Sequence, residues 1–135
     1  MFSLPRMRTA KDVEAYLDRL GRAYRATDEG GTFVLEGARS VPIALRVDPP
    51  LVVLRANVGK VPTDRETVIF RRLLELNASS LVHSSYGIIE DNIHLGSALA
   101  LENLDLNELQ AALDEIEMAL AQQAPSLFEL SRTNS

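Results

Sequence analysis

Few side chains in this sequence could do acid–base or metal chemistry, and their spacing argues against a shared site. The chain has no cysteine, and its only histidines are His83 and His94. Both fall in segments predicted to be the two strands of one hairpin, which would place His94 opposite Ile88 or Ile89. At about 3.3 Å per residue, His83 would then lie about 17–20 Å away. One metal ion could not bind both imidazoles, so we expect no metal site.

Serines gather beside His83, but their surroundings do not resemble a nucleophile site. They are Ser79, Ser80, Ser84 and Ser85. A serine nucleophile needs a base and an oxyanion hole, usually on a sharp turn, and the chain has no Gly-x-Ser-x-Gly segment. The acidic pairs Glu90-Asp91 and Asp114-Glu115 fall on a turn and on a helix exterior rather than in a shared buried site. We therefore expect a protein that is not an enzyme, with no catalytic residues and no cofactor.

The composition suits one small domain. The 135 residues are 46% hydrophobic and 24% charged, which is ordinary for a chain long enough to bury its own core. We expect one domain over residues 1–135, with frayed tails at 1–8 and 131–135. The first residues lack the apolar core of a signal peptide, and no apolar run approaches the ~20 residues that span a bilayer. We expect a cytoplasmic protein without membrane contact.

Charge is divided unevenly along the chain. Residues 1–72 hold 13 Lys and Arg against 9 Asp and Glu, whereas residues 73–135 hold Arg132 alone against 10 acids. Nucleic acid binding needs a concentrated basic face, which the acidic second half opposes. In the first half, acids such as Asp12 and Asp18 are interleaved with the arginines, a pattern typical of solvated helix faces. We expect no nucleic acid partner.

The first half of the chain is predicted to form a helix and three strands. Thr9 is placed as the N-cap of a helix of about four turns, which Gly30-Gly31 ends. Its apolar stripe is Val13, Tyr16, Leu17, Leu20 and Tyr24. Apolar alternation then predicts strands at residues 32–36, 41–47 and 51–58, an antiparallel meander with a proline turn at 48–50.

A second helix is predicted at residues 63–78. Thr63 and Glu66 have the spacing of a capping box. The apolar surface of this helix is wider than one contact with a sheet requires, and comprises Val68, Ile69, Phe70, Leu73, Leu74 and Leu76. Such a surface fits either a helix deep in the core or one that also faces a second subunit, and the sequence leaves both open.

A hairpin and a third helix complete the expected order. Residues 82–89 and 93–101 are predicted strands, joined over residues 90–92. Asp105 and Glu108 form a capping box for the last helix, which is expected to end at Ala124-Pro125. A tail from Ser126 follows, packing through Leu127, Phe128 and Leu130. The expected fold is α+β, with the element order α-β-β-β-α-β-β-α.

Three segments resemble one known group of proteins. A leucine-rich helix ends in Leu-Asn-Ala at residues 76–78, a glycine-containing strand follows at 85–88, and Leu-Asp-Leu-Asn-Glu-Leu at 104–109 opens the final helix. This pattern resembles the type III secretion chaperone-like superfamily, which includes the CesT-type effector chaperones and the YbjN-like proteins. The resemblance implies a twisted antiparallel sheet with helices packed against it, and a homodimer.

The resemblance also implies where partners bind. A dimer interface is expected on the second helix, at Ile69, Phe70, Leu73, Leu74 and Leu76. A client surface is expected on the first helix and first strands, at Tyr16, Leu20, Phe33 and Val34. The implied function is to hold an extended segment of a client protein by strand addition and apolar contact. The alternative is a YbjN-like regulatory or scaffold protein that binds a folded partner.

Overall fold

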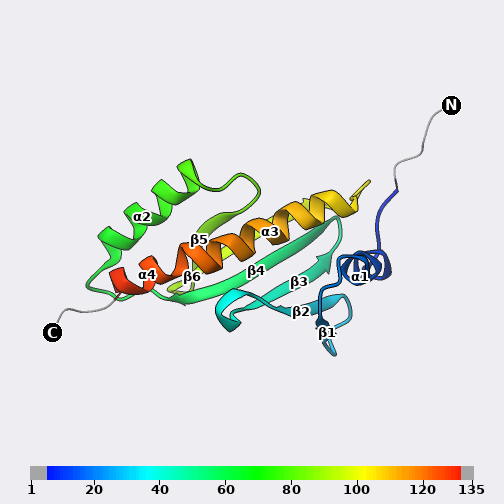
Figure 1. The fold of residues 1–135 in the computed structure, drawn as a ribbon, viewed down its shortest axis with the longest axis horizontal. Coiled ribbons are helices and arrows are strands. Elements are labelled where there is room, and N and C mark those ends of the chain that lie inside the picture. The colour runs from blue at the N-terminus through cyan, green and yellow to red at the C-terminus, as the bar shows by residue number, and fades with distance from the viewer. Residues whose placement is uncertain (1–5, 132–135) are drawn as a thin grey trace.

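The computed structural model describes residues 6–131, which form a six-stranded antiparallel sheet with helices against it (Figure 1). The strand order is β1-β2-β3-β4-β6-β5, so β1 and β5 are the two edges. The elements in chain order are α1 (Ala10–Arg19), β1 (Tyr24–Ala26), β2 (Thr32–Glu36), the 3-10 turn η1 (Ala38–Ser40), β3 (Pro42–Asp48), β4 (Leu51–Lys60), α2 (Glu66–Ser79), β5 (Ser85–Ile89), β6 (Asn92–Ala100), α3 (Leu106–Gln122) and α4 (Ala124–Ser131). The expected α+β class is confirmed.

One face of the sheet carries the core. Successive strand residues alternate faces, and on β4 the residues Val52, Leu54, Ala56 and Val58 are buried. Leu113 and Ile116 of α3 meet this face with less than 2% of their surface exposed. Burying one such side chain stabilises the fold by about 1.5–3 kcal/mol. Figure 1 shows α3 lying across the sheet, with α1 near β1 and α2 near β5.

The first helix is shorter than predicted, and a strand was missed. Gly21 adopts φ 70°, and its N–H donates to the Asp18 carbonyl while Arg22 N–H donates to the Leu17 carbonyl. This left-handed residue ends the helix before Tyr24. Tyr24 then lies in β1, where its ring meets that of Phe33 edge-on at 5.6 Å. Tyr24, although spaced like a member of the helical apolar stripe, is therefore a strand residue.

The capping boxes expected at α2 and α3 had opposite outcomes, while the Thr9 cap of α1 forms with Asp12. At α3 the box is confirmed: Glu108 N–H donates to Asp105 Oδ1 at 2.8 Å, and Asp105 N–H donates to Glu108 Oε1 at 3.2 Å. At α2 the expected box does not form. Arg65 N–H donates to the Pro62 carbonyl in a tight turn, so the helix begins only at Glu66 and has no side-chain cap.

The ends of the described chain also differ in part from expectation. Instead of a tail, α4 follows α3, because Pro125 lies in a first turn where its missing N–H costs nothing. At the other end, Arg8 N–H donates to the Leu101 carbonyl, and Asn103 N–H donates to the Arg6 carbonyl. Of the expected frayed tails, residues 1–5 and 132–135 lie outside the described residues. No helix between residues 6 and 131 is long and apolar enough to cross a membrane.

Candidate protein-binding surfaces

The wide apolar surface of α2 has two sides with different surroundings. Ile69, Leu73 and Leu76 are buried in the core, with at most 4% of their surface exposed. Phe70 is 37% exposed and Leu74 is 68% exposed. These two outward residues line a shallow groove together with Thr67, Arg71, Glu75 and Ala78. Three of the five expected interface residues therefore belong to the core, and two lie at the surface.

Edge strand β5 lies beside α2, and a side chain of α2 occupies part of its outer edge. Asn77 Nδ2 donates to the Tyr86 carbonyl at 3.1 Å, and Tyr86 N–H donates to Asn77 Oδ1 at 2.7 Å. The amide thus pairs with Tyr86 as a neighbouring strand would. The Tyr86 hydroxyl donates to Gln123 Oε1 at 2.7 Å, and burial raises the pKa of Tyr86 to about 12. The sequence did not predict this role of Asn77, because its partner Tyr86 lies nine residues away on another element.

Glu115 of α3 holds the linker between α2 and β5. Its carboxylate accepts hydrogen bonds from the N–H groups of Val82, His83 and Ser84 and from the Ser84 hydroxyl. Burial acts to raise the pKa of Glu115, but the Ser84 hydroxyl and these N–H groups outweigh it, so the pKa is lowered. This contact was also missed, since Glu115 was placed on a helix exterior.

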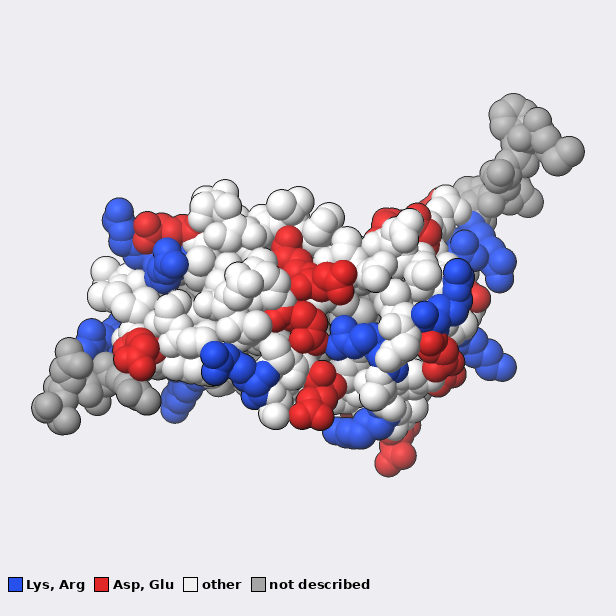
Figure 2. Space-filling view, in the orientation of Figure 1, with Lys and Arg blue, Asp and Glu red and all other residues white. Residues whose placement is uncertain are grey.

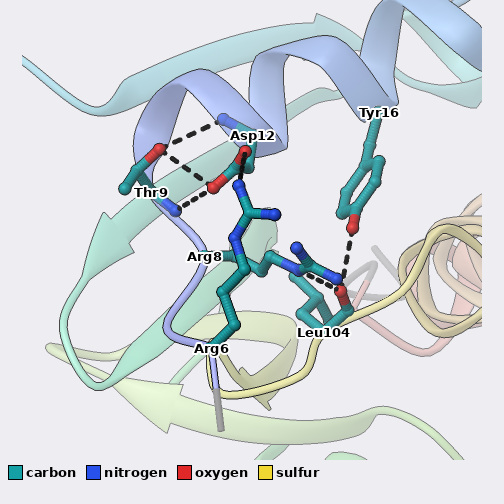
Figure 3. Close-up of polar contacts among 6 residues, drawn as sticks. All are labelled: Arg6, Arg8, Thr9, Asp12, Tyr16 and Leu104. Carbon is teal, nitrogen blue, oxygen red and sulfur yellow. Dashed lines mark hydrogen bonds and ion pairs between the residues drawn. The ribbon is translucent and has the colours of Figure 1, made fainter. Parts of the chain in front are cut away.

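The expected client residues lie at the other end of the sheet, in different surroundings. Tyr16 is half-buried, and its hydroxyl donates to the Leu104 carbonyl at 2.9 Å, an oxygen that Arg8 Nε also contacts (Figure 3). Leu20 is half-buried against the core. Phe33 is 5% exposed and points into the core, whereas Val34 points to the opposite face and lines a shallow hollow.

The free edge of the sheet at this end is β1. Thr27 N–H donates to the Thr32 carbonyl at 3.0 Å. Because bonded and non-bonded pairs alternate in an antiparallel ladder, the N–H and C=O groups of Tyr24 and Ala26 point away from β2. No described strand lies beyond β1. This edge therefore offers unpaired backbone groups, where β5 is partly covered by Asn77.

The histidine register differs from expectation. Glu90 and Asp91 form a two-residue turn, so His94 pairs with Gly87 rather than with Ile88 or Ile89. His83 lies in the linker before β5, and both histidines line one hollow on the sheet face away from the core. The long separation expected along a strand therefore does not apply. Among residues 6–131, no three His, Asp or Glu side chains gather as a metal site would require.

Solved structures from type III secretion systems share this fold of an antiparallel sheet with helices packed against it. A family model, CesT_Tir_1, matches residues 6–133, and the chain belongs to that family. The resemblance drawn from the sequence is confirmed. A search of curated proteins found no match.

Solved structures share the fold at low sequence identity. YbjN from E. coli aligns with a TM-score of 0.68 and 13% identity over 91% of this chain and 96% of that one. The ExoU–SpcU complex of the type III secretion system of Pseudomonas aeruginosa aligns at 0.68 and 16% identity, covering 84% and 95%. The ExsC–ExsE complex aligns at 0.62 and 20% identity, covering 96% and 100%. At these identities the likeness shows a common fold.

Proposed function

We propose that this protein is a cytoplasmic, non-catalytic binding protein that holds an extended segment of a client protein at the β1 edge. The observation that carries the proposal is the row of unpaired backbone groups on Tyr24 and Ala26. An extended segment adds to such an edge by backbone hydrogen bonds. Similar structures support a protein partner, since they include chaperone–effector and chaperone–fragment complexes.

Apolar contacts beside the edge would supply the rest of the affinity. Tyr16 and Leu20 on α1 and Val34 on β2 are half-exposed near β1. Phe33 contributes indirectly, because its ring packs against that of Tyr24 and so supports the position of β1. In this proposal β5 is the less favourable edge for a client strand, because Asn77 already bonds both outward backbone groups of Tyr86.

A homodimer through the outer face of α2 is part of the proposal. Phe70 and Leu74 present apolar surface there, and Val68 adds to it at 44% exposure. A two-fold axis would bring the same helix face of each subunit together, so that each residue contributes to the interface twice. Ile69, Leu73 and Leu76 would support this face from within the core.

The β1 proposal can be tested with one pair of variants at Ala26. Ala26→Pro removes the outward N–H, whereas Ala26→Val keeps it and serves as the matched control. Partners are first identified by pull-down from the host with mass spectrometry, and the bound region is then made as a peptide. Losing one or two edge hydrogen bonds should weaken peptide binding about three- to tenfold in Ala26→Pro by calorimetry. Equal binding by both variants would contradict strand addition at β1.

The second candidate is a YbjN-like scaffold that binds a folded partner, which the structural similarity to YbjN favours. The same peptide separates the two functions. A client chaperone binds the isolated, unfolded segment, whereas a scaffold binds the partner only when that partner is folded. Binding confined to the folded partner would replace the first proposal with the second.

A further inference from the structure

The sheet face away from the core is uncovered and has an ordered arrangement of side chains. Strand register aligns one residue from every strand in a single row. The row is Arg25, Val34, Ala44, Arg55, Gly96 and Ser85, and we call the whole face the open face. Apart from the two arginines, the residues of this row have side chains no larger than valine, so the backbone or short side chains of a partner could approach closely.

Three arginines, Arg25, Arg46 and Arg55, stand on the open face without partners. All three are exposed, and none makes an ion pair or side-chain hydrogen bond within residues 6–131. Arg25 and Arg55 are three strands apart, about 14 Å at the usual strand spacing. Arg46 and Arg55 are diagonal neighbours on adjacent strands, about 7–8 Å apart.

The open face also carries two acids, Glu36 and Asp48, at the ends of β2 and β3, but its three arginines outnumber them. The chain carries a net charge of −5. On the opposite, helix-covered face, acidic side chains gather across the middle (Figure 2). Like charges on neighbouring strands destabilise a sheet slightly, so an anionic partner would relieve the repulsion between Arg46 and Arg55.

A hollow beside Arg55 has the features of a docking site. It is lined by Ser85, Gly87, His94 and Gly96, among others. Gly96 keeps it open, since a Cβ there would lie 2.9 Å from the Leu54 carbonyl oxygen. His94 Nδ1 is the buried side-chain polar atom that has no hydrogen-bond partner within the described chain. A partner that supplies a hydrogen bond here would satisfy it.

We infer that the open face binds an acidic segment of a protein, whose carboxylates pair with Arg25, Arg46 and Arg55. Single-stranded nucleic acid is also anionic, but it binds sheets through aromatic stacking as well as charge. The row across the open face contains no aromatic residue, and the net charge opposes a polyanion of that density. This surface lies on a different part of the sheet from the free backbone edge of β1 and does not depend on it.

The test uses a labelled peptide of about 16 residues with Glu at every fourth position, and its Gln counterpart as a control. Binding is measured by fluorescence anisotropy at low and at physiological salt. The double variant Arg46→Gln/Arg55→Gln is compared with Arg19→Gln/Arg72→Gln, which removes two exposed helix arginines and makes the same change in net charge. Circular dichroism and thermal melting confirm that both variants fold.

The intact protein should prefer the Glu peptide, and salt should weaken that binding. The open-face double variant should bind it about five- to tenfold more weakly, and the helix double variant less than about twofold more weakly. Equal losses in both variants, or equal binding of the Glu and Gln peptides, would overturn the inference. Tighter binding of an oligothymidylate than of the Glu peptide would overturn it in favour of nucleic acid. Loss of client binding in Ala26→Pro with Glu-peptide binding intact would support two separate surfaces.

Discussion

The outer face of α2 allows a sharp test of the proposed dimer. Leu74 is 68% exposed, whereas Leu73, one residue earlier on the same helix, is 4% exposed. Leu74→Glu should therefore leave the fold intact and separate the subunits. Leu73→Ala, a core substitution, should instead lower the free energy of unfolding by about 2–5 kcal/mol.

The expected size of the Leu74 effect follows from its exposed area. Burying most of one leucine side chain stabilises an interface by about 1–2 kcal/mol, and two-fold symmetry counts the residue twice. The loss of about 3 kcal/mol would raise the dimer dissociation constant by about 100-fold. A buried, unpaired carboxylate would add to this loss.

Sedimentation velocity measures the outcome directly, because one subunit has a mass of 14.9 kDa. The wild-type protein should sediment as a dimer at micromolar concentration, and Leu74→Glu as a folded monomer. Glu66→Gln is a matched control, since it changes an exposed charge on the same helix outside the groove. A monomeric wild type, or a Leu74→Glu dimer as tight as the wild type, would refute the assignment of this interface.

Three further predictions concern polar contacts. Glu115→Gln should lower the free energy of unfolding by about 1–2 kcal/mol in urea at neutral pH, a modest loss because the carboxylate is only partly buried. The pKa of Glu115 lies below its ordinary 4.5 in the folded protein. Its contribution to the free energy of unfolding is therefore present above that value and is lost as the pH falls through the lower, folded pKa. A difference in unfolding free energy between wild type and Glu115→Gln that stays constant down to strong acid would contradict this. Asn77→Ala should expose the Tyr86 backbone, cost about 1 kcal/mol, and increase self-association through β5 in light scattering. Tyr16→Phe should cost about 0.5–1.5 kcal/mol in thermal melting through the lost bond to Leu104, while no change would show that Arg8 alone holds that carbonyl.

Elements with local signals were predictable from the sequence. The β2 strand matches its predicted residues because the buried Phe33 and Leu35 alternate with half-buried or exposed positions. The Asp105 box marked the start of α3 because both of its partners lie within one helical turn. The same rule gave a wrong prediction at Thr63, because Pro62 to Arg65 form a turn in place of the first helical turn. A capping signal is informative only where no other turn competes for the same residues.

The binding surfaces depended on information that periodicity does not carry. The spacing of apolar residues on α2 could not separate Leu73 from Leu74, since both belong to one broad stripe and only packing assigns each a side. Asn77 and Glu115 act on backbone groups 9 and 31–33 residues away, so neither had a local pattern. The arginines of the open face are spread over three strands, and only the sheet register places them together.

The two edges of the sheet differ because of the side chains beside them. At β5, Asn77 bonds the outward backbone groups of Tyr86, and Glu115 bonds the linker that leads into the strand. At β1, the backbone groups of Tyr24 and Ala26 have no such partner within the described chain. Exposed edges invite uncontrolled pairing, so proteins usually cover or shorten them. In the proposed function, this difference directs strand addition to the three-residue edge β1, because β5 is already partly covered. In the same proposal α2 and β5 face a second subunit, while β1 remains free for a client.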